Sequence, residues 1–313
     1  PTVPVETPAD WHDALNLITK EIERNPSRKV IVFLDELPWL STPRSGLIQQ
    51  LDHFWNTSWS QKSNLILIAC GSAASWMLDH LILAKGGLHN RITQTVRLLP
   101  FCLKETQHYL EAQSVRLDHK QVLDLYLVMG GIPYYLNQIK NGLSAILNIH
   151  DICFQKTGLL SSEFDIVFTS LFGRSPWYKK IVQVLSHHHE GLARTQLYEK
   201  LKLLSGGRMQ KRLEELEQAG FIAGYTPFGR QQDALYRVSD EYSLFYERWI
   251  HPLTKHRLVG PDYWLKKTQT AEWLSWAGYA FESVCLKHLP QMARALRVDH
   301  TSYVAGSWRL FGS

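Results

Sequence analysis

Two short runs of consecutive apolar residues interrupt a chain whose other apolar positions mostly recur with helical spacing. Residues 30–34 read VIVFL, and residues 65–69 read LILIA. Unbroken apolar runs of this length are typical of strands in a parallel sheet that is covered on both faces. Residues 9–29, before the first run, have a helical pattern from Trp11 to Ile22. This alternation of helix and strand predicts an α/β fold with a parallel sheet.

Helices and strands continue to alternate up to residue 131, and the pattern then changes. Helices are expected at residues 45–61, 73–83, 103–113 and 118–130, and a short strand at residues 94–100. After Gly131 no strand is expected for about 90 residues, and the chain reads as helical. We therefore expect an α/β core over residues 1–140, followed by a helical lid or linker over residues 141–172.

A second pattern starts near residue 173. Three helical segments at residues 175–189, 193–201 and 205–220 precede two short strands at residues 221–230 and 234–240. Three helices followed by a β-hairpin predict a winged helix-turn-helix over residues 173–255. Its last helix, residues 241–253, is aromatic-rich with helical spacing, which favours core packing over a stacking platform. A strong helix at residues 273–289 opens a third unit, residues 256–313.

Composition places the chain among ordinary globular proteins. It has 313 residues, 45% of them hydrophobic and 20% charged, with a net charge of +5. This mildly basic balance is compatible with a nucleotide or nucleic-acid partner without being diagnostic of either. The four cysteines have no metal-ligand spacing, so we expect buried free thiols and a cytoplasmic protein. No apolar run is long enough to span a membrane, so we expect no membrane partner.

The first apolar run ends on two adjacent carboxylates, Asp35 and Glu36. Open parallel sheets bind ligands at the carboxyl ends of their strands. There, an aspartate can hold Mg²⁺ through water, and a glutamate beside it can polarise an attacking water. The pattern of four apolar residues followed by Asp-Glu is the Walker B signature. The alternative is a strand exit that carries solvated acids.

Two further residues fit a phosphate site at the same edge of the sheet. Ser72 follows the second apolar run, where its hydroxyl could bond the attacking water or a γ-phosphate; the alternative is a helix cap. Arg91 precedes the expected strand at residues 94–100 and could act as an arginine finger. The alternative for Arg91 is a structural role away from any phosphate.

Four segments in order now identify a resemblance: FLDELPWL, LILIACGSAASWM, GLHNRITQTVRLLPF and GGIPYYL. Together they resemble the archaeal-type ATPase family of the AAA+/STAND P-loop NTPases, and the resemblance continues through the remainder of the chain. It implies an ATP- and Mg²⁺-dependent switch ATPase with Asp35, Glu36, Ser72 and Arg91 as catalytic residues. It also implies that Gly130, Gly131 and Pro133, in the GGIPYYL segment, contribute to the nucleotide site.

One part of the family's pattern does not occur in the chain. The family's ATPase begins with a Walker A loop, GxxxxGK(S/T), whose amides and lysine hold the phosphates. No such motif is found among the 313 residues. The resemblance therefore implies a fragment that lacks the first strand and the P-loop and binds ATP weakly or not at all.

The resemblance also covers the C-terminal part, which is similar to the start of a PD-(D/E)xK nuclease domain. Glu282 matches that domain's first metal-binding glutamate, and the remaining acids would follow Ser313. The alternative for Glu282 is an acid on a helix surface. In the expected winged helix, Arg208, Lys211 and Arg212 could contact the phosphates of duplex DNA. The alternative there is packing on the ATPase or on a protein partner.

The sequence thus leaves three hypotheses for function. The leading one is a switch ATPase, present here without its P-loop. The second is a DNA-binding regulator or nuclease-associated module, and the third is a remnant without activity. A self-associated state or a protein partner is compatible with each of them.

Overall fold

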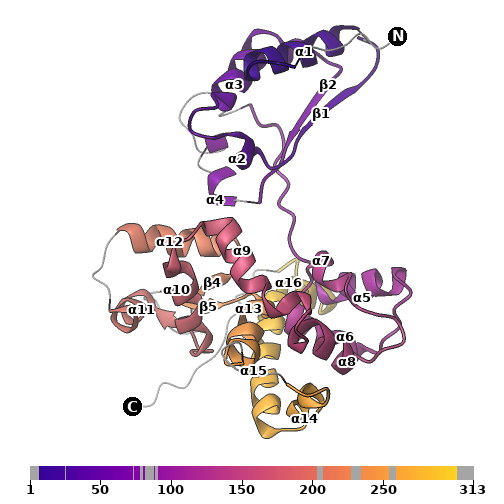
Figure 1. The fold of residues 1–313 in the computed structure, drawn as a ribbon, viewed down its shortest axis with the longest axis vertical. Helices are drawn as coiled ribbons and strands as arrows, with labels where there is room; N and C mark the ends of the chain where they lie inside the picture. The colour runs from indigo at the N-terminus through magenta and orange to yellow at the C-terminus, as the bar shows by residue number, and fades with distance from the viewer. Residues whose placement is uncertain are drawn as a thin grey trace. The chain divides into compact units, whose positions relative to one another are not determined.

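The chain folds into two compact units, residues 1–97 and residues 98–313, which are described here one at a time (Figure 1). The computed structural model describes residues 7–24, 26–72, 74–77, 80–81, 88, 91–202, 207–226, 234–253 and 259–301. The segment expected as an ATPase core, residues 1–140, continues across the division between the units. The expected lid, winged helix and C-terminal segments all belong to the second unit.

The first unit is built around two parallel strands. Its elements are α1 (Trp11–Arg24), β1 (Val30–Leu34), α2 (Leu37–Leu40), α3 (Leu47–Thr57), η1 (Trp59–Gln61), β2 (Leu65–Ala69) and α4 (Ala74–Met77). The pairing runs without slippage from Val30 opposite Leu65 to Leu34 opposite Ala69. Both strands and the crossover helix α3 between them were predicted from the apolar pattern, and the parallel pairing confirms that prediction.

Only one face of this sheet is covered within the described residues. Apolar side chains of α1 and α3, including Leu15 and Leu51, pack on one face of β1 and β2. The other face exposes 62% of Ile31, 56% of Phe33, 41% of Ile66 and 42% of Ile68. The expectation of two covered faces is therefore wrong here, because both helices pack on the same side of the sheet.

The strand expected at residues 94–100 does not form. Residues 92–100 have no regular secondary structure, and every side chain from Arg91 to Pro100 is exposed. A strand is stabilised by hydrogen bonds to a neighbour, and among the described residues this sheet contains only β1 and β2. Residues 92–100 pair with neither strand, so the apolar composition of this segment was insufficient to form a strand.

The second unit begins with helices that form one side of its core. They are α5 (Leu103–Ala112), α6 (His119–Met129), α7 (Pro133–Leu136), α8 (Ala145–Ile149), the π-helical turn η3 (His150–Phe154), η4 (Leu159–Ser161) and α9 (Glu163–Phe172). The carboxylate of Asp118 accepts a hydrogen bond from the amide of Gln121 and so caps α6. The helices expected at residues 103–113 and 118–130 are confirmed.

Three helices and a small antiparallel sheet follow. They are α10 (Pro176–Ser186), β3 (Leu192–Ala193), α11 (Arg194–Leu201), α12 (Gly207–Gln218), β4 (Ile222–Tyr225) and β5 (Leu235–Val238), with the strands in the order β3–β5–β4. All were expected except β3, whose two residues are too few to leave a pattern in the sequence. The last elements are α13 (Glu241–Phe245), the π-helical turn η5 (Tyr246–Ile250), α14 (Tyr263–Thr268), α15 (Ala271–Lys287) and α16 (Leu289–Ala295).

The core of the second unit is rich in aromatic side chains. The rings of Trp249, Trp264 and Trp273 lie within 6 Å of one another, centroid to centroid, and all three residues are buried. Tyr242 and Phe245, from the same aromatic-rich segment as Trp249, are also buried, which confirms their predicted place in the core. Of the four free cysteines only Cys153 is buried. Within the described residues, no helix is both long and apolar enough to span a membrane.

Candidate functional site

The carboxylates Asp35 and Glu36 directly follow β1, at the edge where β1 and β2 both end. Two backbone hydrogen bonds extend the pairing beyond the strands. The amide of Cys70 donates to the carbonyl of Leu34 at 3.0 Å, and the amide of Leu37 donates to the carbonyl of Cys70 at 2.8 Å. The segment after β2 is thus fixed beside the two acids, as expected for parallel strands.

Asp35 is exposed and accepts a hydrogen bond from a neighbouring thiol. The Sγ of Cys70 lies 2.8 Å from Oδ1 of Asp35. This hydrogen bond is the main cause that raises the pKa of the Cys70 thiol above its ordinary value, because a carboxylate acceptor favours the protonated thiol. The thiol is therefore a donor to Asp35 at neutral pH.

Glu36 is half-buried and is held by both donors of Ser72. The amide of Ser72 lies 3.2 Å and its hydroxyl 3.0 Å from Oε2 of Glu36. The backbone of Glu36 has φ 48° and ψ 51°, a left-handed conformation that is uncommon for residues other than glycine. Such conformations persist only where surrounding contacts fix them. Here the fixing contacts come from Ser72 and from the paired backbone at Leu37 and Cys70.

Gly71 allows the two segments to approach closely. A Cβ atom at Gly71 would lie 2.6 Å from Cδ and 2.8 Å from Cγ of Pro38, and 3.0 Å from Sδ of Met77. No side chain fits at these distances without moving the ring of Pro38. Position 71 therefore requires glycine as long as position 38 is proline.

Arg91 is not joined to the acids by the interactions that the structure records. Its side chain is exposed, and no ion pair or hydrogen bond links it to Asp35 or Glu36 in the described part of the chain. Its amide donates to the carbonyl of Leu88 at 3.0 Å, which closes a local turn. The arginine-finger role of Arg91 stays a prediction.

Gly130, Gly131 and Pro133 lie in the second unit, where local packing accounts for each of them. A Cβ at Gly131 would lie 1.9 Å from the carbonyl oxygen of Phe101. Gly130 ends α6 with φ +61°, and a Cβ there would lie 2.7 Å from Oε2 of Glu241. Pro133 is the first residue of α7, where a missing amide proton costs nothing. Their predicted role at a nucleotide is untested.

Glu241 is a buried carboxylate beside Gly130. Both of its oxygens lie 2.9 Å from Nζ of Lys287, and only 5% of the residue is exposed. Burial raises the pKa of Glu241, and the charge of Lys287 partly opposes this effect. The pair joins the start of α13 to the end of α15, and it was not singled out from the sequence.

Glu282 lies on α15 and is exposed. Among the described residues, no group of three or more His, Cys, Asp or Glu side chains could hold a metal ion. Glu282 therefore has no set of companion ligands in this part of the chain, and its nuclease-like role remains a prediction.

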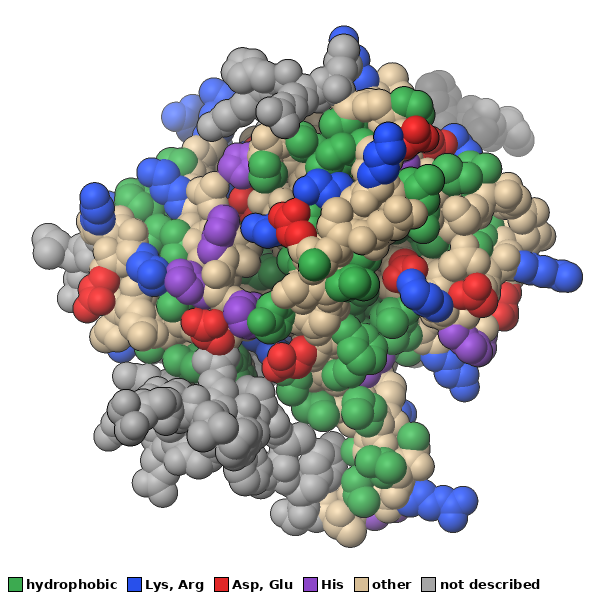
Figure 2. Space-filling model, turned by 90° about the horizontal axis from the view of Figure 1, so that it is seen from below, with side chains coloured by type: hydrophobic (Ala, Val, Ile, Leu, Met, Phe, Trp, Pro, Cys, Tyr) green, Lys and Arg blue, Asp and Glu red, His purple; other side chains and the backbone are tan. Residues whose placement is uncertain are grey.

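The three basic residues of α12 are not equivalent. Arg208 and Lys211 are exposed, whereas Arg212 is half-buried with its guanidinium 5.6 Å from the ring centroid of Trp177. The Nζ of Lys211 lies 4.0 Å from a carboxylate oxygen of Glu215. Over the face drawn in Figure 2, Lys and Arg side chains are interspersed with Asp and Glu. The predicted contacts of Arg208, Lys211 and Arg212 with DNA are untested.

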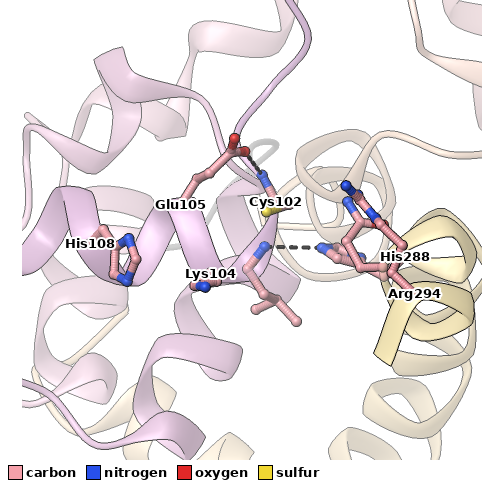
Figure 3. A pocket seen from close by; sticks show the side chains of 8 residues that line it. Cys102, Lys104, Glu105, His108, His288 and Arg294 are labelled. Carbon is pink, nitrogen blue, oxygen red and sulfur yellow. Dashed lines mark hydrogen bonds between the residues drawn. The ribbon is translucent and has the colours of Figure 1, made fainter. Parts of the chain in front are cut away.

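A separate pocket of about 560 Å³ lies where α5 starts and α15 meets α16 (Figure 3). Its lining includes Lys104, Glu105, His108, His288 and Arg294. The Nε2 of His288 accepts from the amide of Leu103 at 2.9 Å, while Nδ1 donates to the carbonyl of Val284 at 2.7 Å. The polar atoms of His288 are thus used in joining α5 to α15.

The acids after β1 meet part of what a magnesium-bound nucleotide requires. Carboxylate oxygens are ligands that Mg²⁺ accepts, directly or through water, and Asp35 is exposed with one oxygen beyond the thiol contact. The hydroxyl of Ser72 lies at the same edge of the sheet. Backbone amides and a lysine for the phosphates are not supplied by a GxxxxGK(S/T) motif in these 313 residues. The residues present fit the metal side of such a site.

The sequence predicted Asp35, Glu36 and Ser72 at one edge of the sheet, where the structure has them, whereas their catalytic roles are untested. It gave no role to Cys70. A cysteine at the end of an apolar strand is ordinarily a core residue. The available signal was its position, because residues that follow paired positions of parallel strands become neighbours.

A solved structure has the same type of fold. A Walker-type ATPase of Pyrococcus abyssi is similar to this chain with a TM-score of 0.56 and 15% sequence identity, over 79% of this chain and 72% of that one. At this identity the similarity establishes the fold alone. It confirms the coarse prediction that the chain has a mixed α/β fold.

The remaining comparisons are weaker. A RuvB structure from Thermotoga maritima is similar to this chain with a TM-score of 0.34 and 13% sequence identity, over 72% of each chain. An uncharacterized protein of Methanocaldococcus jannaschii is 22% identical over 307 residues, which is 96% of this chain. This chain spans 64% of the length of that relative. No family model matches the chain.

Proposed function

We propose that the intact protein is a magnesium-dependent ATPase whose catalytic carboxylates are Asp35 and Glu36. The observation that carries this proposal is the clustering of Asp35, Glu36 and Ser72 at the carboxyl ends of two parallel strands, with Ser72 hydrogen-bonded to Glu36. A parallel sheet presents ligands at this edge. The fold shared with a Walker-type ATPase is consistent with it.

Each residue has a distinct role in this proposal. Asp35 would hold Mg²⁺ through water, and bound Mg²⁺ would neutralise charge on the phosphates. Glu36 would orient and polarise the attacking water, which requires its carboxylate to leave the two donors of Ser72. Ser72 would then be free to donate to a phosphate oxygen. No GxxxxGK(S/T) motif occurs in these 313 residues, so the proposal concerns the metal side of the site.

The test is ATP binding and hydrolysis by the intact protein and its variants. Glu36→Gln is expected to keep nucleotide binding while hydrolysis falls by at least about 100-fold, as for loss of a general base. Asp35→Asn is expected to weaken the magnesium dependence of both. Glu282→Gln, an exposed acid in the other unit, serves as the control. Hydrolysis at the wild-type rate by Asp35→Asn would refute the role of Asp35.

A second candidate function, binding of duplex DNA, is favoured by one arrangement in the second unit. The order α10–β3–α11–α12–β4–β5, with strand order β3–β5–β4, supports the proposal of a winged helix, in which α12 would be the recognition helix. Arg208 and Lys211 point from α12 to solvent. Glu214 and Glu217, also exposed on α12, oppose this function by charge repulsion with phosphates.

This candidate is tested by duplex binding at several salt concentrations. If Arg208 and Lys211 contact phosphates, the double variant with alanine at both positions should bind more weakly and show a salt slope smaller by about two. Arg212→Ala is the matched comparison, because its guanidinium packs on Trp177 and should affect stability more than the salt slope. An unchanged slope in the double variant would exclude α12 as the DNA-binding element.

A further inference from the structure

Cys70 lies where its side chain can orient the proposed metal ligand. Asp35 follows Leu34 and Cys70 follows Ala69, and these two residues are paired across the parallel strands. Because side chains alternate along a strand, Asp35 lies on the same face as Phe33, and Cys70 on the same face as Ile68. This is the open face of the sheet, so the two side chains are neighbours at its end.

The backbone of Cys70 is fixed on both sides. Its amide is bonded to Leu34 and its carbonyl to Leu37, at 3.0 and 2.8 Å. These bonds place the Cα of Cys70 at a constant position beside Asp35. Its side chain then has a single heavy-atom torsion, so the thiol is presented to the carboxylate at little cost in conformational entropy.

The thiol contact determines how the carboxylate of Asp35 is turned. Sγ lies 2.8 Å from Oδ1, and among the described residues no other hydrogen-bond donor to Asp35 is recorded. An exposed aspartate without such a contact would sample several rotamers. With Oδ1 engaged, Oδ2 is left available for a metal-bound water. Groups that hold a metal's carboxylate ligands in this way tune metal affinity strongly.

We infer that Cys70 is a positioning residue, whose thiol orients Asp35 for the magnesium ion of a bound nucleotide. The inference rests on the proposed ATPase function and adds a residue to it. It assigns no chemical step to Cys70.

The experiment measures metal binding directly rather than turnover. Free Mn²⁺ is quantified by electron paramagnetic resonance with the intact protein and a non-hydrolysable ATP analogue. The variants are Cys70→Ala, Cys70→Ser and Asp35→Asn, with Cys285→Ala, a half-buried cysteine of the other unit, as the matched control. Nucleotide affinity without metal is measured in parallel with a fluorescent analogue.

Cys70→Ala is expected to weaken Mn²⁺ binding about tenfold at unchanged metal-free nucleotide affinity. Cys70→Ser retains a donor and is expected to stay close to the wild type, as is Cys285→Ala. Equal Mn²⁺ affinity in Cys70→Ala and wild type, with weakened binding in Asp35→Asn, would overturn the inference and leave the ATPase proposal standing. Equal weakening in the alanine and serine variants would also overturn it. Absence of nucleotide-dependent Mn²⁺ binding in the wild type would refute both.

Discussion

At the scale of single residues, Gly131 is fixed by a neighbouring backbone. The carbonyl of Gly131 accepts a hydrogen bond from the amide of Phe101 at 2.8 Å. The phenol of Tyr126 donates to the carbonyl oxygen of Phe101 at 3.0 Å and holds that oxygen in place. This oxygen is the atom that a Cβ at Gly131 would approach to 1.9 Å. The segment before α5 and the end of α6 can therefore pair only with glycine at this position.

Gly131→Ala is accordingly expected to lower the free energy of unfolding of the second unit by at least about 3 kcal/mol, because main-chain atoms must move. Urea unfolding followed by circular dichroism measures this. Gly278→Ala, in the exposed middle of α15 with nothing within 4 Å, is the control and should stabilise by up to about 1 kcal/mol. Similar small effects for both would show that the backbone at Phe101 adjusts freely.

The ion pair of Glu241 and Lys287 predicts that replacing Lys287 lowers the stability of the second unit by an amount that depends on pH. Burial raises the pKa of Glu241, so at intermediate pH the folded chain holds a proton that the unfolded chain releases. The free energy of unfolding contributed by Glu241 therefore falls as pH rises above the ordinary glutamate range. Lys287 opposes this fall, and Asp240 adds to it.

Lys287→Met should thus lose more stability at about pH 8 than at about pH 5, with a loss near pH 8 of about 3 kcal/mol. Urea titrations at several pH values give this difference. Lys266→Met is the control, since the 3.8 Å pair with Asp262 is exposed on both sides. Adding Glu241→Gln to Lys287→Met should recover much of the loss. A loss that is constant with pH would contradict the role assigned to Glu241.

At the scale of elements, the sequence predicted those helices and strands that depend on residues close together in the chain. The two apolar runs became β1 and β2 because a run of β-branched and other large apolar residues has no competing helical period. Capping by Asp118 and the glycine at position 130 marked α6 to within a residue. The site was predictable where it follows strand ends, as Asp35 and Ser72 do.

The features that sequence missed depend on partners distant along the chain. The segment 94–100 has strand-like composition, yet a strand also requires a paired neighbour, and this segment pairs with neither β1 nor β2. The role of Cys70 follows from register, which one strand alone does not specify. The contacts of Gly130 and Gly131 come from Glu241 and Phe101, and no spacing within GGIPYYL reveals these contacts.

The open face of the two-stranded sheet allows a test at this scale. Phe33→Thr and Ile66→Thr exchange exposed apolar side chains for one that suits a strand, so each should change the stability of the first unit by at most about 0.5 kcal/mol. Leu51 lies on α3 and its side chain is buried, so Leu51→Ala should lower the free energy of unfolding of the first unit by about 2–5 kcal/mol. Hydrogen exchange of the β1 and β2 amides reports both. Equal costs for the exposed and buried positions would show that the open face is covered in solution.

At the scale of the molecule, the described residues of each unit form a core of their own. The core around Leu15, Leu51 and Trp59 belongs to the first unit, and the aromatic core around Trp249 and Trp264 to the second. The segment from Arg91 to Pro100 joins them and is exposed throughout, with 90% of Leu98 accessible. Each core should therefore unfold in its own transition, the first unit at the lower denaturant concentration.

Limited trypsin digestion should cut first after Arg91 or Arg97, because exposed backbone without secondary structure is the preferred substrate of proteases. Mass spectrometry would then identify a stable fragment that starts at Ile92 or Leu98. Replacing both arginines by glutamine should delay fragmentation without altering the unfolding of the second unit. A first cut inside α6 or α15 would contradict the division of the chain.

The contact between Gly71 and Pro38 also constrains how such sequences can diverge. Since a Cβ at position 71 would lie 2.6 Å from the proline ring, Gly71 cannot be replaced freely while Pro38 is retained. Positions 38 and 71 should consequently change together during evolution, although 33 residues separate them in the chain. A relative that replaces the glycine should also have lost the proline. In a deep alignment of relatives, positions 38 and 71 should therefore covary.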